Sequence, residues 1–525
     1  MEEQIQATDT SQLIQAASDF ALYPGTHNEA SINEFFNRFP LPAIMNLLQT
    51  NAGESDLENA LVTCLERIFK SKYGSSLIPQ YMAFLQAGLQ ADSEAVKCLA
   101  CKTVSFLFEN LSDESVLPAQ LIISNDIYPL LLSCLVSSDE QVATAATDAI
   151  KKFASTSEGM ATIFPAESSE STDLGHLASK CSSLGRIRIL SLIVKLFSVS
   201  YAVASVIYNS NLLGLFEEEV SKTNDILAAL SVLELLYELT EIEHASEFLP
   251  KTSLLQLLSS IISNNSVDSI LRSRSVMISG RILSKENVFT FVEETGVLSI
   301  IEAIKKRLMS NESVNDNECE SALEAIGQIG SSARGAELLL LRSLEVVKFV
   351  TSTSFDRQRR GKQLAALHSL GNIAGVNRSE NNILLGRDAE ENFKRLFYEI
   401  ASMTSKLTPS GLFLSVLKQE SEIRVAGYRL ISGLVTRAWC LSEVCSRQDI
   451  INIVTDAYIE STKIGMESRH ECCLSINKAL LSSNLKNDSV FVGILTKLQE
   501  AIKRGPYLTQ KHADAIPAIM TDQRF

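Results

Sequence analysis

Apolar residues recur along this chain at positions i, i+3, i+4, i+7 and i+8, a spacing that places them on one side of an α-helix. Residues 124–156, SNDIYPLLLSCLVSSDEQVATAATDAIKKFAST, contain two such stripes, which begin at Ile127 and Val142 and are separated by a short polar segment. The pattern predicts a helical hairpin. Because two helices of this length cannot bury both stripes against each other, the hairpin needs further helices to complete its core.

The second stripe of this hairpin recurs through the whole sequence. Its register begins at Leu57, Val96, Val142, Ile187, Ile226, Leu271, Cys319, Leu364, Ile423 and, less regularly, near Arg469. Successive starts are about 39 to 48 residues apart, with one interval near 59 that contains the insertion SMTSKLTPSG. A period of this length is typical of armadillo and HEAT arrays, in which each repeat is two or three helices. The core that a single hairpin lacks is therefore supplied by the neighbouring repeat.

We predict an all-α fold, a right-handed α-solenoid of about ten armadillo/HEAT-type units. No run of β-branched residues alternates with polar ones over a useful length, and no Asn-Gly or Asp-Gly hairpin turn occurs. Ser138 and Gln141 have the spacing of a capping box at the start of the second helix of the hairpin. We expect one continuous array over residues 1–502.

Three segments interrupt the helical pattern. Residues 159–175 are rich in Ser and acidic residues, and residues 402–411 contain a proline and a glycine, so each is expected to be an exposed flexible loop or a loosened helix. Residues 503–525 lose the helix period and contain two prolines. We expect this last segment to be an extended or partly disordered tail.

Composition and charge narrow the class of partner and the location. The chain has 525 residues, of which 46% are hydrophobic, and a formal net charge of −15. This charge opposes binding to phosphate backbones, so we expect no nucleic acid partner and favour a basic protein surface. The acidic start MEEQIQATDT is not a secretory signal, and no segment approaches the roughly 18 apolar residues that cross a bilayer. Together with ten scattered cysteines that fit reduced thiols, these features predict no membrane association and a cytoplasmic or nuclear location.

Motifs with a catalytic meaning are weak. Cys98 and Cys101 form a CxxC, but they lie inside a helix register and no second pair stands at zinc-ribbon spacing. The sequence RRGKQ at 359–363 is not a phosphate-binding loop, because Asp356 stands where the first glycine is required and Gln363 stands where Ser or Thr would hold magnesium. Gly327 and Gly330 follow a helix and not a strand, which favours close helix packing over a dinucleotide site. We therefore predict no enzyme, no metal site and no cofactor.

A solenoid without a catalytic site binds other proteins along a surface to which each repeat contributes one helix. Polar side chains on the second-stripe helices are candidates for this surface, namely Arg272, Arg274, Arg424 and Arg429. The alternative is that these arginines are only solvated. Trp439, the only tryptophan, is a candidate interface anchor because large aromatic residues dominate binding hot spots, and its alternative role is packing at a joint between the last two repeats.

Several segments of the C-terminal half resemble one known family. They are ALEAIGQIGSSARGAELLL, LTPSGLFLSVLKQESEIRVAGYRLISGLVTRAWCLSEVCS, INIVTDAYIE, ECCLSINKALLSS and the closing GPYL. Their order and spacing, with Trp439 after LISGLVTRA, are similar to those of the family of the non-ATPase regulatory subunit 5 of the 26S proteasome. The stretch SLGRIRILSLIVKLFSVS, followed by NSNLLGLFEEEV, also resembles this family, whereas the first 90 residues share only the repeat pattern.

This resemblance implies a function in proteasome assembly. Members of the family are armadillo/HEAT-type chaperones that bind the C-terminal domain of one AAA-ATPase subunit of the regulatory particle base and leave before the 26S particle is complete. By the resemblance, this chain would hold one ATPase subunit with its neighbouring base subunits and sterically delay docking to the core particle. We expect a monomer outside the complex, since the end repeats act as caps. The alternative is another armadillo/HEAT scaffold or adaptor, related to transport or to ubiquitin ligases, that shares the fold.

Overall fold

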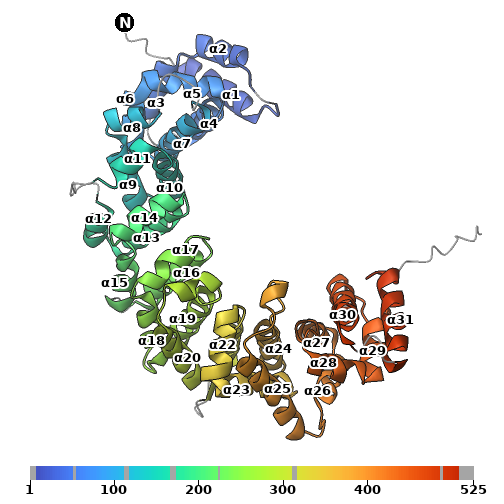
Figure 1. Cartoon of the computed structure of the whole chain (residues 1–525). Helices are drawn as coiled ribbons and strands as arrows, with labels where there is room; N and C mark the ends of the chain where they lie inside the picture. The colour runs from blue at the N-terminus through green and yellow to red at the C-terminus, as the bar shows by residue number, and fades with distance from the viewer. Residues whose placement is uncertain are drawn as a thin grey trace, which may run out of the picture. The chain divides into compact units, whose positions relative to one another are not determined.

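The computed structural model of the chain describes residues 7–25, 27–50, 55–111, 118–165, 173–222, 225–309, 316–484 and 489–507. Over these ranges the chain consists of helices joined by turns and contains no strand, so the predicted all-α class is confirmed (Figure 1). Packing divides the chain into two compact units, unit 1 over Met1–Ser253 and unit 2 over Leu254–Phe525. The single array expected over residues 1–502 stays a prediction.

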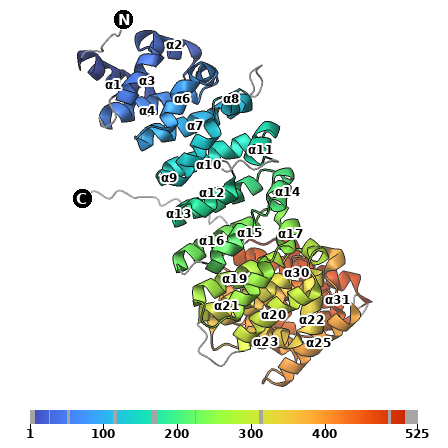
Figure 2. The ribbon, with the colours of Figure 1, turned by 90° about the vertical axis from the view of Figure 1, so that its left-hand side faces the viewer.

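Unit 1 is a stack of short helices. Its elements are α1 Ala7–Leu22, α2 Glu29–Arg38, α3 Leu41–Thr50, α4 Ser55–Phe69, α5 Lys72–Leu77, η1 Ile78–Tyr81, α6 Met82–Leu89, α7 Glu94–Asn110, α8 Pro118–Ser124, α9 Ile127–Ser137, α10 Glu140–Ala154, α11 Ser157–Ile163, α12 Leu174–Lys180, α13 Ser183–Phe197, α14 Tyr201–Asn209, α15 Gly214–Lys222, α16 Ile226–Thr240, α17 Ala245–Phe248 and η2 Leu249–Lys251. Helices α4, α7, α10, α13 and α16 pack each against the next, and they follow one another down the view of Figure 2. We call these five helices the unit-1 row.

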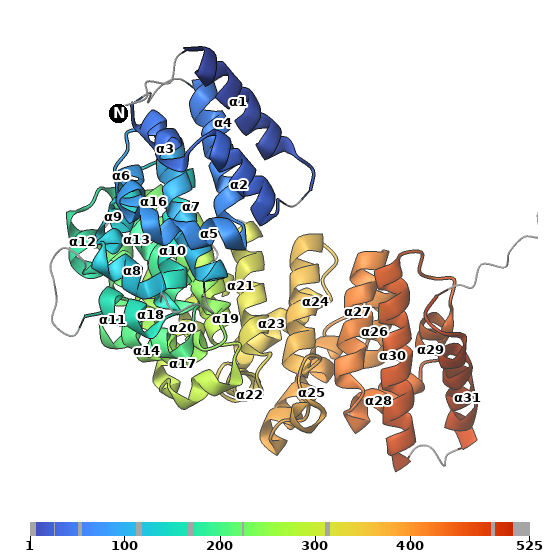
Figure 3. The same ribbon diagram turned by 90° about the horizontal axis from the view of Figure 1, so that it is seen from above.

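Unit 2 repeats the same arrangement. Its elements are α18 Leu254–Ser263, α19 Ser269–Ile282, η3 Glu286–Thr290, α20 Glu294–Met309, α21 Asp316–Ile329, α22 Ala333–Arg342, α23 Leu344–Ser354, α24 Arg360–Ala374, η4 Glu380–Asn382, α25 Arg387–Ser402, α26 Pro409–Leu417, α27 Ser421–Leu434, α28 Ala438–Cys445, α29 Gln448–Thr455, α30 Lys463–Ser482 and α31 Ser489–Arg504. Helices α19, α21, α24, α27 and α30 pack each against the next and form the unit-2 row. Figure 3 shows α21, α24, α27 and α30 side by side.

The hairpin of α9 and α10 shows why the stack holds together. Ile127 and Leu131 of α9 and Val142, Ala146 and Phe153 of α10 are all buried, as the apolar spacing predicts. Helix α10 packs on α9 within its own hairpin and on α7 and α13 in the neighbouring repeats. Burial of a side chain such as Val, Ile or Phe contributes about 1.5–3 kcal/mol. Much of the stability of each hairpin therefore depends on its neighbours.

The capping box predicted at Ser138 is wrong. The N-cap of α10 is Asp139, whose carboxylate accepts a hydrogen bond from the amide of Val142 at 2.8 Å. Ser138 instead ends α9, where its own amide donates to the carbonyl of Cys134. A carboxylate at the N-cap satisfies a free amide and also interacts favourably with the positive end of the helix dipole, so Asp139 serves better than the preceding serine.

The three segments expected to break the helical pattern are partly helical. Segment 159–175 takes in most of α11 and the start of α12, and its residues 166–172 lie outside the described part of the chain. Segment 402–411 runs from the last residue of α25 into the first turn of α26. Helix α31 extends two residues into segment 503–525, of which residues 508–525 are not described.

Among the helices that the structure describes, none alone is long and apolar enough to cross a membrane. The bent pair α8 and α9, with an angle of 81° between the two helices, passes such a test by length and composition only.

Candidate partner-binding surfaces

A groove of about 1020 Å³ lies over the exposed faces of α4, α7 and α10, and we call it the unit-1 groove. Charged pairs link successive helices across it. The ammonium of Lys102 lies 2.9 Å from the carboxylate of Glu66, and Lys152 pairs with Glu109. All four side chains are at least one third exposed, so each pair contributes no more than about 1 kcal/mol to stability. Their charges remain accessible to the polar surface of a partner.

Cys98 of the CxxC lies in the unit-1 groove, and Cys101 is buried one turn further along α7. Burial raises the pKa of the Cys98 thiol, and a hydrogen bond with Cys134 together with burial raises that of Cys101. A nucleophilic or redox cysteine needs a lowered pKa, which is the opposite direction. All ten cysteines are free, and the described residues contain no cluster of His, Cys, Asp and Glu that could hold a metal ion.

A second groove, of about 920 Å³, lies over α24, α27, α28 and α30, and we call it the unit-2 groove. Two glycines shape it. Gly375 ends α24 in the left-handed conformation, with φ +95°, and a Cβ on Gly433 would lie only 2.6 Å from the side chain of Val376. Lys478 of α30 forms an ion pair with Glu380 of η4, and both residues line the groove. The groove thus combines an apolar part with a charged bridge.

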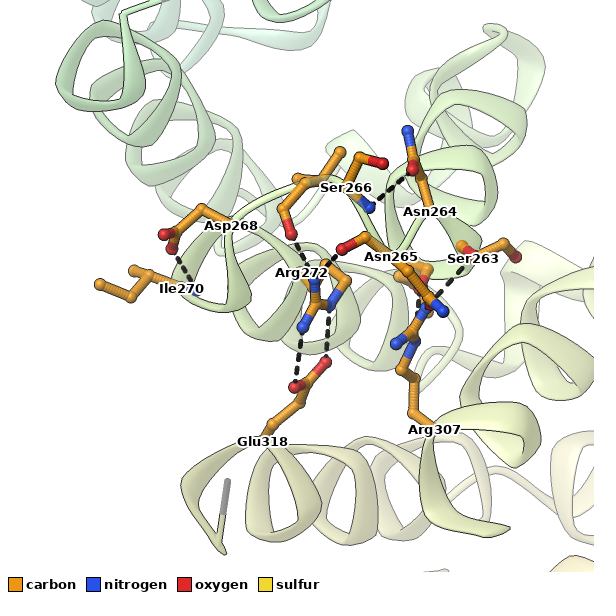
Figure 4. Close-up of polar contacts among 11 residues, drawn as sticks. Ser263, Asn264, Asn265, Ser266, Asp268, Ile270, Arg272, Arg307 and Glu318 are labelled. Atoms are coloured by element: carbon orange, nitrogen blue, oxygen red, sulfur yellow. Dashed lines mark hydrogen bonds and ion pairs between the residues drawn. The ribbon is translucent and has the colours of Figure 1, made fainter. Parts of the chain in front are cut away.

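The predicted site residue Arg272 is held inside unit 2. Its guanidinium forms two hydrogen bonds with the carboxylate of Glu318 on α21, at 2.8 and 3.1 Å (Figure 4). It also donates to the carbonyl of Val267. The two side chains of the ion pair are only 12% and 5% exposed. Beside them Arg307 donates to the carbonyl of Ile262, at the end of α18. Arg272 therefore joins α19 to the next helix of the unit-2 row.

Arg424 on α27 makes a similar set of contacts nearer the C-terminal end of unit 2. Its guanidinium pairs with the buried carboxylate of Glu460 and donates to the carbonyl of Gln419, five residues earlier. In unit 1, Arg186 of α13 likewise pairs with Glu219 and donates to the carbonyl five residues before it. We call these three arrangements, Arg186–Glu219, Arg272–Glu318 and Arg424–Glu460, the arginine–glutamate clamps.

The other three predicted site residues are also placed within unit 2. Arg429 donates to the carbonyl of His368, at 3.1 Å, and to the side chain of Asn372, at 2.5 Å, both on α24. Burial lowers the pKa of Arg429. Arg274 is half-buried on α19. The ring of Trp439 lies 5.4 Å from the ring of Phe397 and 6.0 Å from that of Tyr398, which places it at the joint between α25 and α28.

The structure does not bring the predicted residues into one groove. None of the five lines either groove, and of the residues considered for chemistry from the sequence only Cys98 does. The signal that could have located the unit-2 groove is the pair of glycines at the ends of consecutive row helices, Gly375 and Gly433. Their effect depends on the neighbouring Val376, so spacing alone does not reveal it.

Two stacks of short helices with long polar faces define an α-helical repeat scaffold of the armadillo/HEAT type. Comparison with known families goes further. Residues 27–521 match the model of the family described as proteasome non-ATPase 26S subunit, and the chain belongs to that family. The resemblance identified from the sequence is thereby confirmed.

The fold agrees with that of one solved structure. The chain is similar to importin beta at 12% identity with a TM-score of 0.51, over 94% of this chain and 64% of that one. It also matches an engineered protein at 15% identity, TM-score 0.40, over 88% of this chain and 98% of that one. A designed armadillo repeat protein for peptide recognition matches at 16% identity, TM-score 0.31, over 44% and 94% of the two chains. No curated protein sequence matches the chain.

Proposed function

We propose that this chain is a non-catalytic chaperone for assembly of the base of the 26S proteasome regulatory particle. It binds the C-terminal domain of one base AAA-ATPase subunit, together with neighbouring base subunits, and its bulk delays docking to the core particle. The observation that carries this proposal is the family match over residues 27–521. As a chaperone of this kind it acts as a monomer outside the complex, in the cytoplasm or the nucleus.

The two grooves support a binding role. Each lies across several helices of one row, so a folded partner can make many modest contacts at once. The net charge of −15 favours a basic protein surface over nucleic acid. The raised thiol pKa values of Cys98 and Cys101 argue against thiol chemistry in the unit-1 groove. A contact role for Arg272, Arg274, Arg424, Arg429 and Trp439 stays a prediction.

Affinity capture of the tagged full-length chain at low salt, followed by mass spectrometry, tests the proposal, because weak surface contacts survive at low ionic strength. We expect base ATPase subunits to dominate the captured proteins. Capture of import cargo or of a ubiquitin ligase without any ATPase subunit would contradict the proposal and favour the adaptor alternative. Nucleotide turnover by the purified chain would contradict its non-catalytic part.

A further inference from the structure

The end of the described chain is fixed beside the unit-2 groove. After α31 the chain returns to α30, where Arg469 donates to the carbonyl of Pro506 at 3.4 Å. The hydroxyl of Tyr507 then donates to the carboxylate of Glu467 on the same helix. The described chain therefore ends at a defined place on α30, within unit 2.

Glu467 belongs to the face of α30 that continues into the groove. Positions four and about seven to eight residues after it lie on the same side of a helix, and these are Glu471, Leu474 and Ser475, which line the groove. Lys478 follows one turn later on the same side, where it pairs with Glu380. The described chain thus ends beside Glu467, the first residue of this face of α30, and the same face continues along the groove.

We propose that the unit-2 groove is a binding site for an extended, proline-containing apolar segment and that its occupant is residues 508–525 of the same chain. This inference rests on the groove and on the position of Tyr507, and it is independent of the proposed function. While the segment is bound, it covers the groove and keeps other peptides of the same chemistry out.

The sequence of the segment, LTQKHADAIPAIMTDQRF, matches the groove in chemistry and in order. A basic residue, Lys511, comes first, and an acidic residue, Asp514, follows it. Along the groove the exposed acidic Glu471 precedes the exposed basic Lys478. In the proposed arrangement Lys511 therefore faces Glu471, and Asp514 faces Lys478.

The apolar run 515–520, AIPAIM, comes next. Its proline favours an extended backbone, which suits a shallow groove better than a helix does. Val376, Leu441 and Leu474 give the groove its apolar lining, and Gly433 lets the side chain of Val376 pack closely against α27. The apolar run 515–520 of the segment thus contacts the apolar part of the unit-2 groove.

The length of the segment also fits. Glu467 and Lys478 are separated by eleven helical residues, or about 16 Å of helix. Seven extended residues, from Tyr507 to Asp514, span at most about 25 Å. Asp514 can therefore reach Lys478, and the apolar run that follows it can reach the rest of the groove.

A peptide-binding experiment on the full-length chain tests the inference. The probe is a fluorescently labelled peptide of residues 508–525, and binding is measured by anisotropy to the wild type and to the double variant Ile516→Asp with Ile519→Asp. These substitutions remove the apolar contacts of the covalent tail, so we expect the peptide to bind the variant at least about tenfold more tightly than the wild type, in which the groove is occupied. Equal binding to both proteins, or binding to neither, overturns the inference.

Two further substitutions localise the peptide. Adding Ser475→Arg to the double variant fills the groove and abolishes peptide binding, whereas adding Thr496→Arg, on the exposed face of α31, leaves it unchanged. If Ser475→Arg lowers the melting temperature, Ala479→Glu in the same groove replaces it. Binding that survives the groove substitutions overturns the inference.

Zero-length carbodiimide cross-linking of the dilute wild type gives an independent readout. The ion pair Lys478–Glu380 should cross-link and serves as the positive control. We expect an intramolecular cross-link between Lys511 and Glu471 in the monomer. The same cross-link in a dimer only would show that the segment binds a second copy, and its absence beside a positive control would count against same-chain binding.

Discussion

For single residues, the arginine–glutamate clamps are largely buried polar contacts between successive segments of the stack. The clamp of Arg424 closes over the carboxylate of Glu460, which is fully buried, and satisfies the backbone carbonyls of Gln419 and Ile459. A buried carboxylate that loses its partner costs far more than an exposed pair. These residues therefore hold the row together before any partner is bound.

We expect Arg424→Ala to lower the free energy of unfolding of unit 2 by about 3–5 kcal/mol, because Glu460 is left buried without its cation. Urea denaturation followed by the fluorescence of Trp439, which lies in the same unit, measures the change. The matched control is Lys463→Ala, which removes an exposed ion pair with Glu467 and should cost less than about 1 kcal/mol. Equal changes in the free energy of unfolding for the two substitutions would contradict a stabilising role for the Arg424–Glu460 pair.

The same clamp makes stability depend on pH. Burial raises the pKa of Glu460, but its hydrogen bonds with Arg424 and Ser421 outweigh burial, so the pKa lies below the ordinary value of 4.5. A carboxyl group with a depressed pKa in the folded state contributes its full stability above pH 4.5 and loses it as the pH falls through the folded value. The difference in unfolding free energy between wild type and Glu460→Gln should therefore be constant above pH 4.5 and shrink in acid. A difference that grows in acid would reverse the assigned sign.

Sequence alone places the arginines on helices but cannot say what they touch. Arg272 and Arg424 occupy exposed-looking positions in the first turns of α19 and α27, which suggests a binding surface. Their partners Glu318 and Glu460 are 46 and 36 residues away, so only the packing of successive repeats shows the pairs. Trp439 is similar, because its packing against Phe397 depends on how α25 and α28 meet.

At the scale of helices, close approach within the unit-2 row depends on small residues. A Cβ on Gly327 of α21 would lie 2.6 Å from the backbone of Ser369 on α24. The sequence predicted close helix packing at this glycine, and the structure confirms it.

We expect Gly327→Ala to destabilise unit 2 by about 1–3 kcal/mol, since the helices must move apart to accept the methyl group. Gly493→Ala in α31 is the matched control. A Cβ there meets nothing within 4 Å, so the substitution should stabilise the helix by about 0.5–1 kcal/mol. The melting temperatures of the two variants should thus shift in opposite directions from that of the wild type. A shift of both in the same direction would argue against a packing role for Gly327.

Helices were predictable here because burial repeats along the sequence with the helix period. Val142, Ala146 and Phe153 are buried as their spacing requires, and the period of the array follows from such stripes. The cap of α10 was misplaced by one residue, because Ser138 and Asp139 are both good caps and only the backbone conformation selects one. The grooves were not predictable, since they depend on which side chains of consecutive helices leave space between them.

At the scale of the whole molecule, the proposed function requires an accessible polar surface. We expect the double substitution Glu66→Lys with Glu109→Lys in the unit-1 groove to reduce capture of base ATPase subunits several-fold, because it reverses exposed acidic charges that face a basic partner surface. Stability should change by less than about 2 kcal/mol, since both ion pairs are exposed. Glu218→Lys, in an exposed pair on α15 outside the groove, is the control and should leave capture unchanged. Equal loss of capture in both variants would remove the unit-1 groove as the contact surface.

We propose that this member of the proteasome non-ATPase subunit family holds a base ATPase subunit during assembly and is absent from the finished particle. Fractionation of cell extract by size in the presence of ATP, with quantitative mass spectrometry of each fraction, tests it most directly. We expect the chain to migrate with base ATPase subunits in small complexes and to be depleted from fractions that contain intact 26S particles. Stoichiometric presence of the chain in the intact particles, or its migration apart from every ATPase subunit, would contradict it.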